Sequence, residues 1–131
     1  MIPARIRIVN FGKVEREYRE IINFYISRIS KISRLKIEEG KYIKEEYVVL
    51  DPSGREVNGE EFYRMIGEYS RNGKEIVFVI GPPAGFEKEN IKNNVKISLS
   101  KLTMRHELAY LVLLEQIYRA LLKLKGVSYE K

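Results

Sequence analysis

The sequence contains no cysteine and only one histidine among its 131 residues, and both shortages exclude classes of site. Without cysteine, the chain can form no disulfide, no thiolate metal site and no cysteine nucleophile. A single histidine argues against a zinc site built by this chain alone, because zinc sites draw their ligands mainly from histidine and cysteine. We therefore expect chemistry that needs no metal.

Long apolar runs are also missing. No stretch approaches the roughly 20 apolar residues that span a bilayer. The opening "MIPARIRIV" alternates as a strand does, and it lacks the continuous apolar segment of a secretion signal. We therefore expect a cytoplasmic protein without membrane contact. The length and the 44% hydrophobic content fit one domain over residues 1–131.

Basic residues are in excess. Lysine and arginine number 24 against 18 acidic residues, which gives a net charge of +6 and favours an anionic partner, RNA or DNA first. No acidic residue occurs between Glu20 and Glu38, whereas Arg28, Lys31 and Arg34 fall in that interval. These three cations are candidate phosphate contacts. A merely solvated basic helix face is an equally good interpretation.

The pattern of apolar residues predicts an α/β protein. Alternation and helical spacing predict strands over 4–9, 47–50, 75–81 and 95–99, and helices over 13–36, 58–71, 87–92 and 105–125. "DPSGRE" predicts a turn, and Asn58 with Glu61 predicts a capping box. This order is typical of a mostly parallel sheet flanked by helices in three layers. The last helix is apolar nearly all round, so we expect a second subunit to cover it.

Three segments follow strands in the way that ligand-binding loops do. Open α/β sheets bind ligands beyond the carboxyl ends of their strands, and "VVLDPSG", "FVIGPPAGF" and "ISLSKLTM" occupy such positions. No dinucleotide-binding or Walker A glycine pattern is present, and no nucleophile elbow surrounds Ser98, Ser100 or Thr103. Glu115 and Arg119 have the spacing of an ordinary intrahelical pair. Local chemistry therefore predicts a ligand site without identifying a reaction.

Longer motifs resemble a known family. "VVLDPSGRE" is similar to a Leu-Asp-x-x-Gly-[Lys/Arg] stretch, "GEEF" to a helix start, and "FVIGPPAGF" to Ile-Gly-Gly-x-x-Gly. "LSKLTMRHELAYLVLLEQIYRA" is similar to Leu-Ser-x-Met-Thr-x-x-His followed by Glu-Gln-x-Tyr-Arg-Ala, and "SYEK" to the tail. With these motifs the chain resembles the RlmH (YbeA) family of SPOUT-class ribosomal RNA methyltransferases over nearly its whole length.

The resemblance implies an α/β trefoil knot, a homodimer, and methyl transfer from S-adenosylmethionine to N3 of a pseudouridine in large-subunit ribosomal RNA. By position, the cofactor-binding residues implied are Leu50, Gly81, Leu99, Ser100, Lys101, Leu102, Thr103 and Met104. The residues implied in activity or RNA placement are His106, Arg119 and Tyr129. Arg105, where relatives commonly have proline, adds a cation that could contact RNA.

Two departures from the family leave alternatives open. Pro82 replaces the second glycine of Ile-Gly-Gly, and Glu130 replaces a histidine of the tail. Glu130 could accept the proton that leaves the acceptor nitrogen, or its charge could weaken RNA binding. The alternatives are a methyltransferase with a different RNA target and a dimeric RNA-binding protein that has lost catalysis and uses the basic segment Arg28–Lys36.

Overall fold

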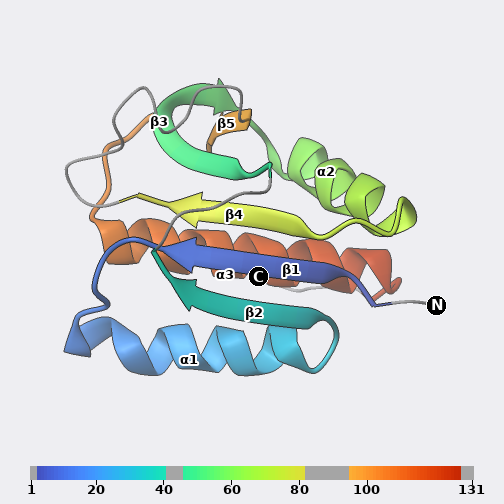
Figure 1. Ribbon diagram of the computed structural model, residues 1–131, viewed down its shortest axis with the longest axis horizontal. Helices are drawn as coiled ribbons and strands as arrows, with labels where there is room; N and C mark the ends of the chain where they lie inside the picture. Colours follow the sequence, from blue (N-terminus) through green and yellow to red (C-terminus); the bar gives the residue numbers. More distant parts are fainter. Residues whose placement is uncertain (1–2, 41–45, 82–94, 128–131) are drawn as a thin grey trace.

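The computed structural model describes residues 3–40, 46–81 and 95–127. In chain order, the elements are β1 (Arg5–Asn10), α1 (Arg16–Ser30), β2 (Arg34–Glu39), β3 (Val48–Glu56), α2 (Gly59–Arg71), β4 (Ile76–Ile80), β5 (Val95–Ser98) and α3 (His106–Leu124). The described strands form a sheet in the order β2-β1-β4-β3-β5, and every neighbouring pair is parallel (Figure 1). All strands therefore end at one edge, the carboxyl edge, and begin at the opposite amino edge.

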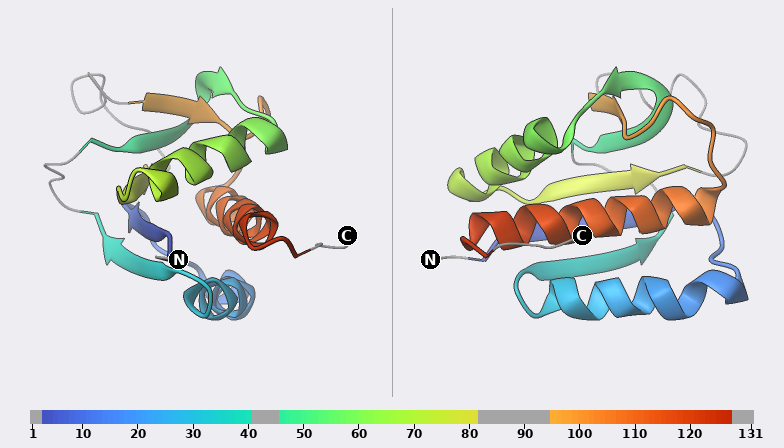
Figure 2. Two further views of the ribbon diagram at one scale, coloured as in Figure 1. Left: turned by 90° about the vertical axis from the view of Figure 1, so that its right-hand side faces the viewer. Right: turned by 180° about the vertical axis from the view of Figure 1, so that it is seen from behind.

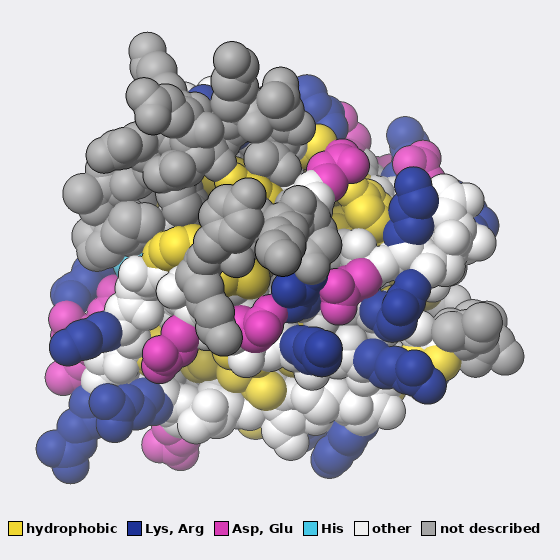
Figure 3. All heavy atoms as spheres, viewed as in Figure 1, with side chains coloured by type: hydrophobic (Ala, Val, Ile, Leu, Met, Phe, Trp, Pro, Cys, Tyr) yellow, Lys and Arg dark blue, Asp and Glu magenta, His cyan; other side chains and the backbone are white. Residues whose placement is uncertain are grey.

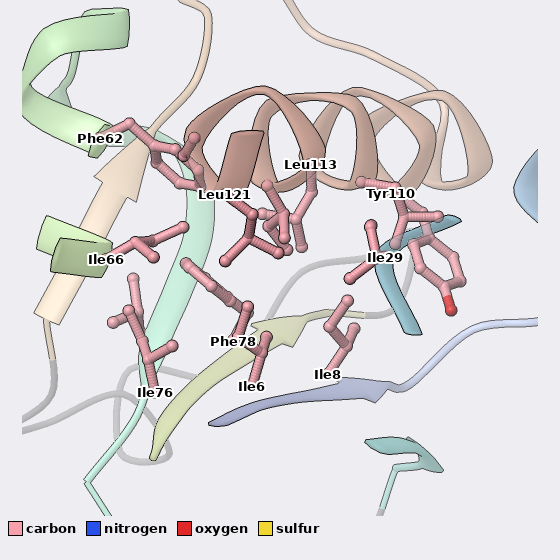
Figure 4. Close-up of a cluster of buried hydrophobic side chains, with 14 of the residues drawn as sticks. Ile6, Ile8, Ile29, Phe62, Ile66, Ile76, Phe78, Tyr110, Leu113 and Leu121 are labelled. Atoms are coloured by element: carbon pink, nitrogen blue, oxygen red, sulfur yellow. The ribbon is translucent and has the colours of Figure 1, made fainter. Parts of the chain in front are cut away.

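The sheet buries apolar side chains on both faces. Alternate residues of a strand point to opposite faces, so Ile6, Ile8 and Phe78 pack in the larger cluster while Val77 and Val79 pack in a second one. The buried apolar side chains of α1, α2 and α3 all belong to the larger cluster (Figure 4). The three described helices therefore cover the same face of the sheet (Figure 2). The expected helix over 87–92 lies outside the described residues, as does any third layer that it would form.

The prediction of a helix over 13–36 was wrong at its end. Helix α1 stops at Ser30, and Arg34–Glu39 forms the edge strand β2 beside β1. The segment "RLKIE" alternates polar and apolar residues with the period of a strand, and Leu35 packs against the main core. Ile32 continues the helical spacing of Ile22, Ile26 and Ile29. Because of this coincidence, the sequence pattern did not indicate that the helix ends at Ser30.

The predicted turn "DPSGRE" is an excursion within β3. Leu50 and Arg55 both pair with Ile97 of β5, so residues 51–54 leave the ladder and return to the same register position. Gly54 permits the return, because a Cβ atom at this position would lie 2.7 Å from the backbone carbon of Ile97.

Helix α3 crosses the middle of the helix layer and supplies much of the core. Its inner face carries the buried side chains Tyr110, Leu113, Leu114, Ile117 and Leu121. Its outer face is only partly covered within one chain, and Leu108 is 39% exposed. None of the described helices combines the length and apolar character needed to cross a membrane.

The predicted capping box at the start of α2 is confirmed. The Asn58 side chain accepts a hydrogen bond from the Glu61 backbone N–H at 2.8 Å, and the Glu61 carboxylate accepts one from the Asn58 N–H at 3.0 Å. Two donors that the first helical turn leaves unpaired are thereby satisfied. At the other end of α2, Gly73 adopts a positive φ of 65°.

We predict that Asn58→Ala lowers the free energy of unfolding by about 1 kcal/mol, because the Glu61 N–H loses its acceptor. Chemical denaturation at a fixed protein concentration measures this change. Asn23→Ala is the control, since Asn23 is exposed within α1 and alanine there should raise helix stability slightly. Equal effects of the two substitutions would contradict the capping role.

Candidate functional site

A cavity of about 180 Å³ opens at the carboxyl edge of the sheet. Its walls come from the β3 excursion, the end of β4, the turn after β5 and the first turns of α3. The lining residues are Leu50, Asp51, Pro52, Ile80, Gly81, Leu99, Ser100, Leu102, Thr103, Met104, His106, Ala109 and Val112. The fold thus brings together the predicted cofactor residues except Lys101, and their binding role remains a prediction.

The turn after β5 is braced by its own hydroxyl groups. The Ser98 hydroxyl donates to the Ser100 carbonyl at 2.7 Å, and the Ser100 hydroxyl accepts from the Leu102 N–H at 3.0 Å. Lys101 is not among the lining residues, and it donates to the Gly54 carbonyl at 3.3 Å, which joins this turn to the β3 excursion. These serines therefore hold backbone in place. The Leu102 side chain at the cavity wall is 74% exposed and available to an apolar ligand surface.

Asp51 places a carboxylate in the cavity wall. Its Oδ1 accepts hydrogen bonds from the Ser53 N–H at 2.8 Å and the Ser53 hydroxyl at 2.7 Å, and Lys96 donates to that hydroxyl at 3.1 Å. Partial burial acts to raise the pKa of Asp51, but the Ser53 hydrogen bonds and the Lys96 charge outweigh burial and lower it. The carboxylate is therefore ionised at neutral pH and can attract a cationic or hydroxyl-bearing ligand.

His106, the first residue of α3, ties the helix to the end of β4. The residue is 8% exposed, and its Nδ1 lies 2.8 Å from the Gly81 carbonyl oxygen. A carbonyl only accepts, so Nδ1 carries the proton and donates. In the described part of the chain, Nε2 has no hydrogen-bond partner. This bond fixes the orientation of the ring, and Nε2 is buried, so we interpret His106 as a positioning residue.

Gly12 provides the space that the His106 ring occupies. A Cβ atom on Gly12 would lie 2.6 Å from Nε2 and 2.7 Å from Cε1 of His106. The Gly12 N–H in turn donates to the buried Asn10 side chain at 3.0 Å, which holds the chain after β1 against the ring. Three carboxyl-edge segments, those of Gly12, Gly81 and His106, therefore meet at one imidazole.

The predicted RNA contacts divide between the two edges of the sheet. Arg105 caps α3 beside the cavity and forms an ion pair with Glu15 at 3.3 Å. Arg28 and Lys31 lie at the end of α1 and Arg34 begins β2, so all three stand at the amino edge. Arg28 stacks over the Phe24 ring at 4.7 Å. One protomer cannot bring these three cations next to its own cavity.

The remaining predicted activity residues lie along α3 and beyond it. Arg119 forms an ion pair with Glu115 at 2.7 Å and lies two turns past Val112, about 10 Å along the helix axis. Tyr129, Glu130 and Pro82 lie outside the described residues. A second groove shares Leu99 and Val112 with the cavity and continues past Gln116 toward the start of α2.

The lining residues Asp51, Pro52, Ile80, Ala109 and Val112 were not predicted from the sequence, and neither was the contact of Gly12 with His106. Asp51 stands in the "LDPSG" segment, so its position directly after a strand could have indicated it. Gly12 gave no local signal, because its role depends on a ring that is distant in sequence. Across residues 3–40, 46–81 and 95–127, no three histidine or acidic side chains gather to hold a metal ion.

Comparisons with known proteins identify relatives of the chain. The family described as "Predicted SPOUT methyltransferase" matches residues 40–130. Ribosomal RNA large subunit methyltransferase H of Coprothermobacter proteolyticus is 37% identical, covering 97% of this chain and 99% of the relative. The protein of the same name from Caldicellulosiruptor saccharolyticus is 37% identical, covering 89% of this chain and 73% of the relative.

Two solved structures share the fold at low sequence identity. TrmJ from Z. mobilis has a TM-score of 0.58 at 10% identity, covering 92% of this chain and 70% of that one. Lpg2936 from Legionella pneumophila, solved with SAM bound, has a TM-score of 0.52 at 15% identity. That match covers 90% of this chain, which spans 66% of the length of Lpg2936. At these identities the likeness establishes the fold.

We predict that Gly12→Ala displaces the His106 ring and lowers the free energy of unfolding by about 1–3 kcal/mol through overpacking. Because His106 is the chain's single histidine, the imidazole signals in a ¹⁵N NMR spectrum need no assignment. The wild type should show the proton on Nδ1, and Gly12→Ala should alter that pattern. A wild-type ring protonated on Nε2 alone, or an unchanged spectrum in the variant, would contradict this arrangement.

Proposed function

This chain belongs to the SPOUT methyltransferase family, and we propose that it transfers a methyl group from S-adenosylmethionine to large-subunit ribosomal RNA. The single observation that carries the proposal is the cavity at the carboxyl edge, whose wall contains seven of the eight residues that the family resemblance assigns to the cofactor. The names of the relatives support ribosomal RNA as the substrate.

The residues in the cavity wall fit this cofactor. Leucine, isoleucine and methionine side chains offer apolar surface for a purine ring. The exposed Leu102 side chain would be buried from solvent by a ring that lies against it. The ionised Asp51 carboxylate suits a ligand with a positive charge and ribose hydroxyl groups. When bound, S-adenosylmethionine supplies a methyl group already activated by its sulfonium, so neither a metal ion nor a covalent nucleophile is required.

The chain's own residues orient the two reactants and exclude water. His106 holds the Gly81 carbonyl in place, and the Ser98–Ser100–Leu102 hydrogen bonds fix the facing turn before any ligand arrives. Such preorganisation lowers the barrier because the reacting atoms need no further alignment. The hydrogen bond through Lys101 keeps the β3 excursion and the turn at a constant separation.

For the RNA, we propose N3 of a pseudouridine as the acceptor, as the resemblance implies. That nitrogen carries a proton which must leave, and the Glu130 carboxylate is our candidate to accept it, with Tyr129 placed against the base. Arg105 beside the cavity and Arg119 along α3 are candidates to contact phosphates. The net charge of +6 supports a polyanionic substrate. A ribosomal substrate would have the chain act in the cytoplasm.

We also propose that two copies pair through the helix layer and that the chain carries the family's trefoil knot. The outer faces of α1 and α3 lie side by side, with Tyr25 and Tyr118 rings 6.2 Å apart. Ile21 is 41% exposed, and Phe24 and Leu108 are exposed on the same layer. An apolar surface spread over two adjacent helices suits a second copy that presents the same surface.

The proposed function is tested by labelled methyl transfer into large ribosomal subunits that lack the modification. We expect the wild type to bind S-adenosylmethionine and to transfer label. Ala109→Leu, which adds a branched side chain to the cavity wall, should weaken cofactor binding at least about tenfold. Isothermal titration calorimetry measures that affinity, and Ala109→Ser is the small-residue control.

Each outcome of this test separates the alternatives. Label on a nucleotide other than pseudouridine would retain the methyltransferase and change its target. RNA binding without cofactor binding would favour the catalytically lapsed RNA-binding protein. If Ala109→Leu bound the cofactor with the affinity of the wild type, the cofactor could not bind in this cavity, and the proposed site would be wrong.

We predict that Ile21→Glu converts the proposed dimer to a monomer, because it places a carboxylate in the apolar surface between the copies. Sedimentation velocity measures the mass in solution. Val95→Glu is a matched control. Val95 is 40% exposed, but it lies on β5, the edge strand farthest from β2. A monomeric wild type, or equal dissociation of both variants, would count against this interface.

A further inference from the structure

The register of β1 and β2 sets cation against cation. Arg5 is the direct neighbour of Arg34, and Arg7 is the direct neighbour of Lys36. These strands are parallel, so each pair of neighbours points to the same face of the sheet, about 4.8 Å apart at the backbone. Like charges placed directly opposite one another destabilise a sheet. For the Arg5–Arg34 pair, the fold therefore tolerates an unfavourable arrangement.

These cations stand on the face of the sheet that the described helices leave free. Ile6 and Ile8 point to the helix layer, so Arg5 and Arg7 point the other way. Figure 3 shows Lys and Arg side chains over β1 and β2 on this face, with Asp and Glu side chains among them. Arg5, Arg34 and Lys36 are exposed, and we call these three the cation strip.

Partners within the chain account for only part of this charge. Arg7 is neutralised by Glu38 at 3.1 Å and Glu75 at 3.2 Å. Arg5 donates to the Gly73 carbonyl and lines a depression that also contains Glu46, Glu68 and Glu75, without an ion pair to any of them. In the part of the chain that the structure describes, Arg34 and Lys36 make no ion pair. Among the described residues, none of the three side chains of the cation strip makes an ion pair, and Arg34 and Lys36 have the least acidic surroundings.

Protection of an edge strand is a competing explanation. Lysine and arginine on an edge strand discourage pairing with other chains, and β2 is an edge strand. That explanation covers Arg34 and Lys36 but leaves out Arg5, which lies on the interior strand β1. It also gives no reason for the register that sets Arg5 against Arg34, since one glutamate on β2 would protect the edge equally and form an attractive pair.

We propose that the cation strip binds the phosphate backbone of RNA at a site separate from the cavity. The inference rests on the proposed function only in taking RNA as the partner. The strip lies toward the amino edge, whereas the cavity lies at the carboxyl edge. The strip would therefore bind a part of the RNA that is remote from the reacting nucleotide. Backbone contacts of this kind position a nucleic acid without reading its sequence.

The repulsion between Arg5 and Arg34 supplies the first test, because it should lower the stability of the fold. Arg34→Glu places a carboxylate opposite Arg5, so we expect the thermal unfolding midpoint to rise while the Kd for a mixed-sequence RNA duplex increases several-fold. Differential scanning calorimetry and fluorescence anisotropy measure the two changes. A lower midpoint with unchanged RNA affinity would make Arg34 a structural residue and overturn the proposal.

The second test removes the whole strip. Arg5→Gln, Arg34→Gln and Lys36→Gln together should raise the Kd for the duplex at least about tenfold and reduce the slope of log affinity against log salt by about 3. The control combines Arg64→Gln, Arg71→Gln and Lys125→Gln, which removes the same charge from exposed positions of the helix layer. Equal losses in both triple variants would reduce the effect to net charge and overturn the proposal.

Two further readouts separate this inference from its alternatives. Cofactor affinity should be unchanged in the strip variant, so lost RNA binding with normal cofactor binding supports the strip even if methyl transfer is never observed. Phosphatidylserine vesicles provide another anionic surface. Loss of vesicle binding with retained duplex binding would assign the strip to a membrane and overturn the RNA proposal.

Discussion

The hydrogen bond from His106 Nδ1 to the Gly81 carbonyl joins the parts of the molecule on which the candidate site depends. Through it, the first turn of α3 is fixed to the end of β4, and the space left by Gly12 lets the turn after β1 close against the same ring. The cavity wall continues from this point through the turn after β5 to the β3 excursion. A shift of the imidazole would therefore move several walls of the cavity together.

The parallel sheet separates two kinds of surface. Its carboxyl edge carries a largely apolar cavity with one ionised carboxylate, suited to a small ligand. The face that the described helices leave free carries, near the amino edge, the neighbouring cations Arg5 and Arg34. The proposed action on RNA would use both surfaces, because holding a polymer and aligning one reacting atom are different tasks. The apolar helix layer remains available for a second copy.

Local signals predicted much of the fold. The continuous apolar segment before Gly81 predicted β4, and the alternation of apolar and polar residues around Ser98 predicted β5. The spacing of Asn58 and Glu61 predicted the start of α2. The strand β2 was missed because Ile32 happens to continue the helical spacing of α1. The cavity lining could be anticipated since carboxyl ends of parallel strands meet at one edge. The close approach of Gly12 to His106 could not, because a contact between distant residues leaves no periodic trace. The charge run through Arg34 was visible in the sequence, but its distance from the cavity depends on the register of β2.

A crystal structure with S-adenosylhomocysteine, the demethylated product of the cofactor, tests the central claim most directly. The account predicts that the ligand lies between Gly81 and the turn from Leu99 to Met104, with the His106–Gly81 hydrogen bond intact. Ligand bound elsewhere, or an empty cavity at saturating concentration, would contradict it.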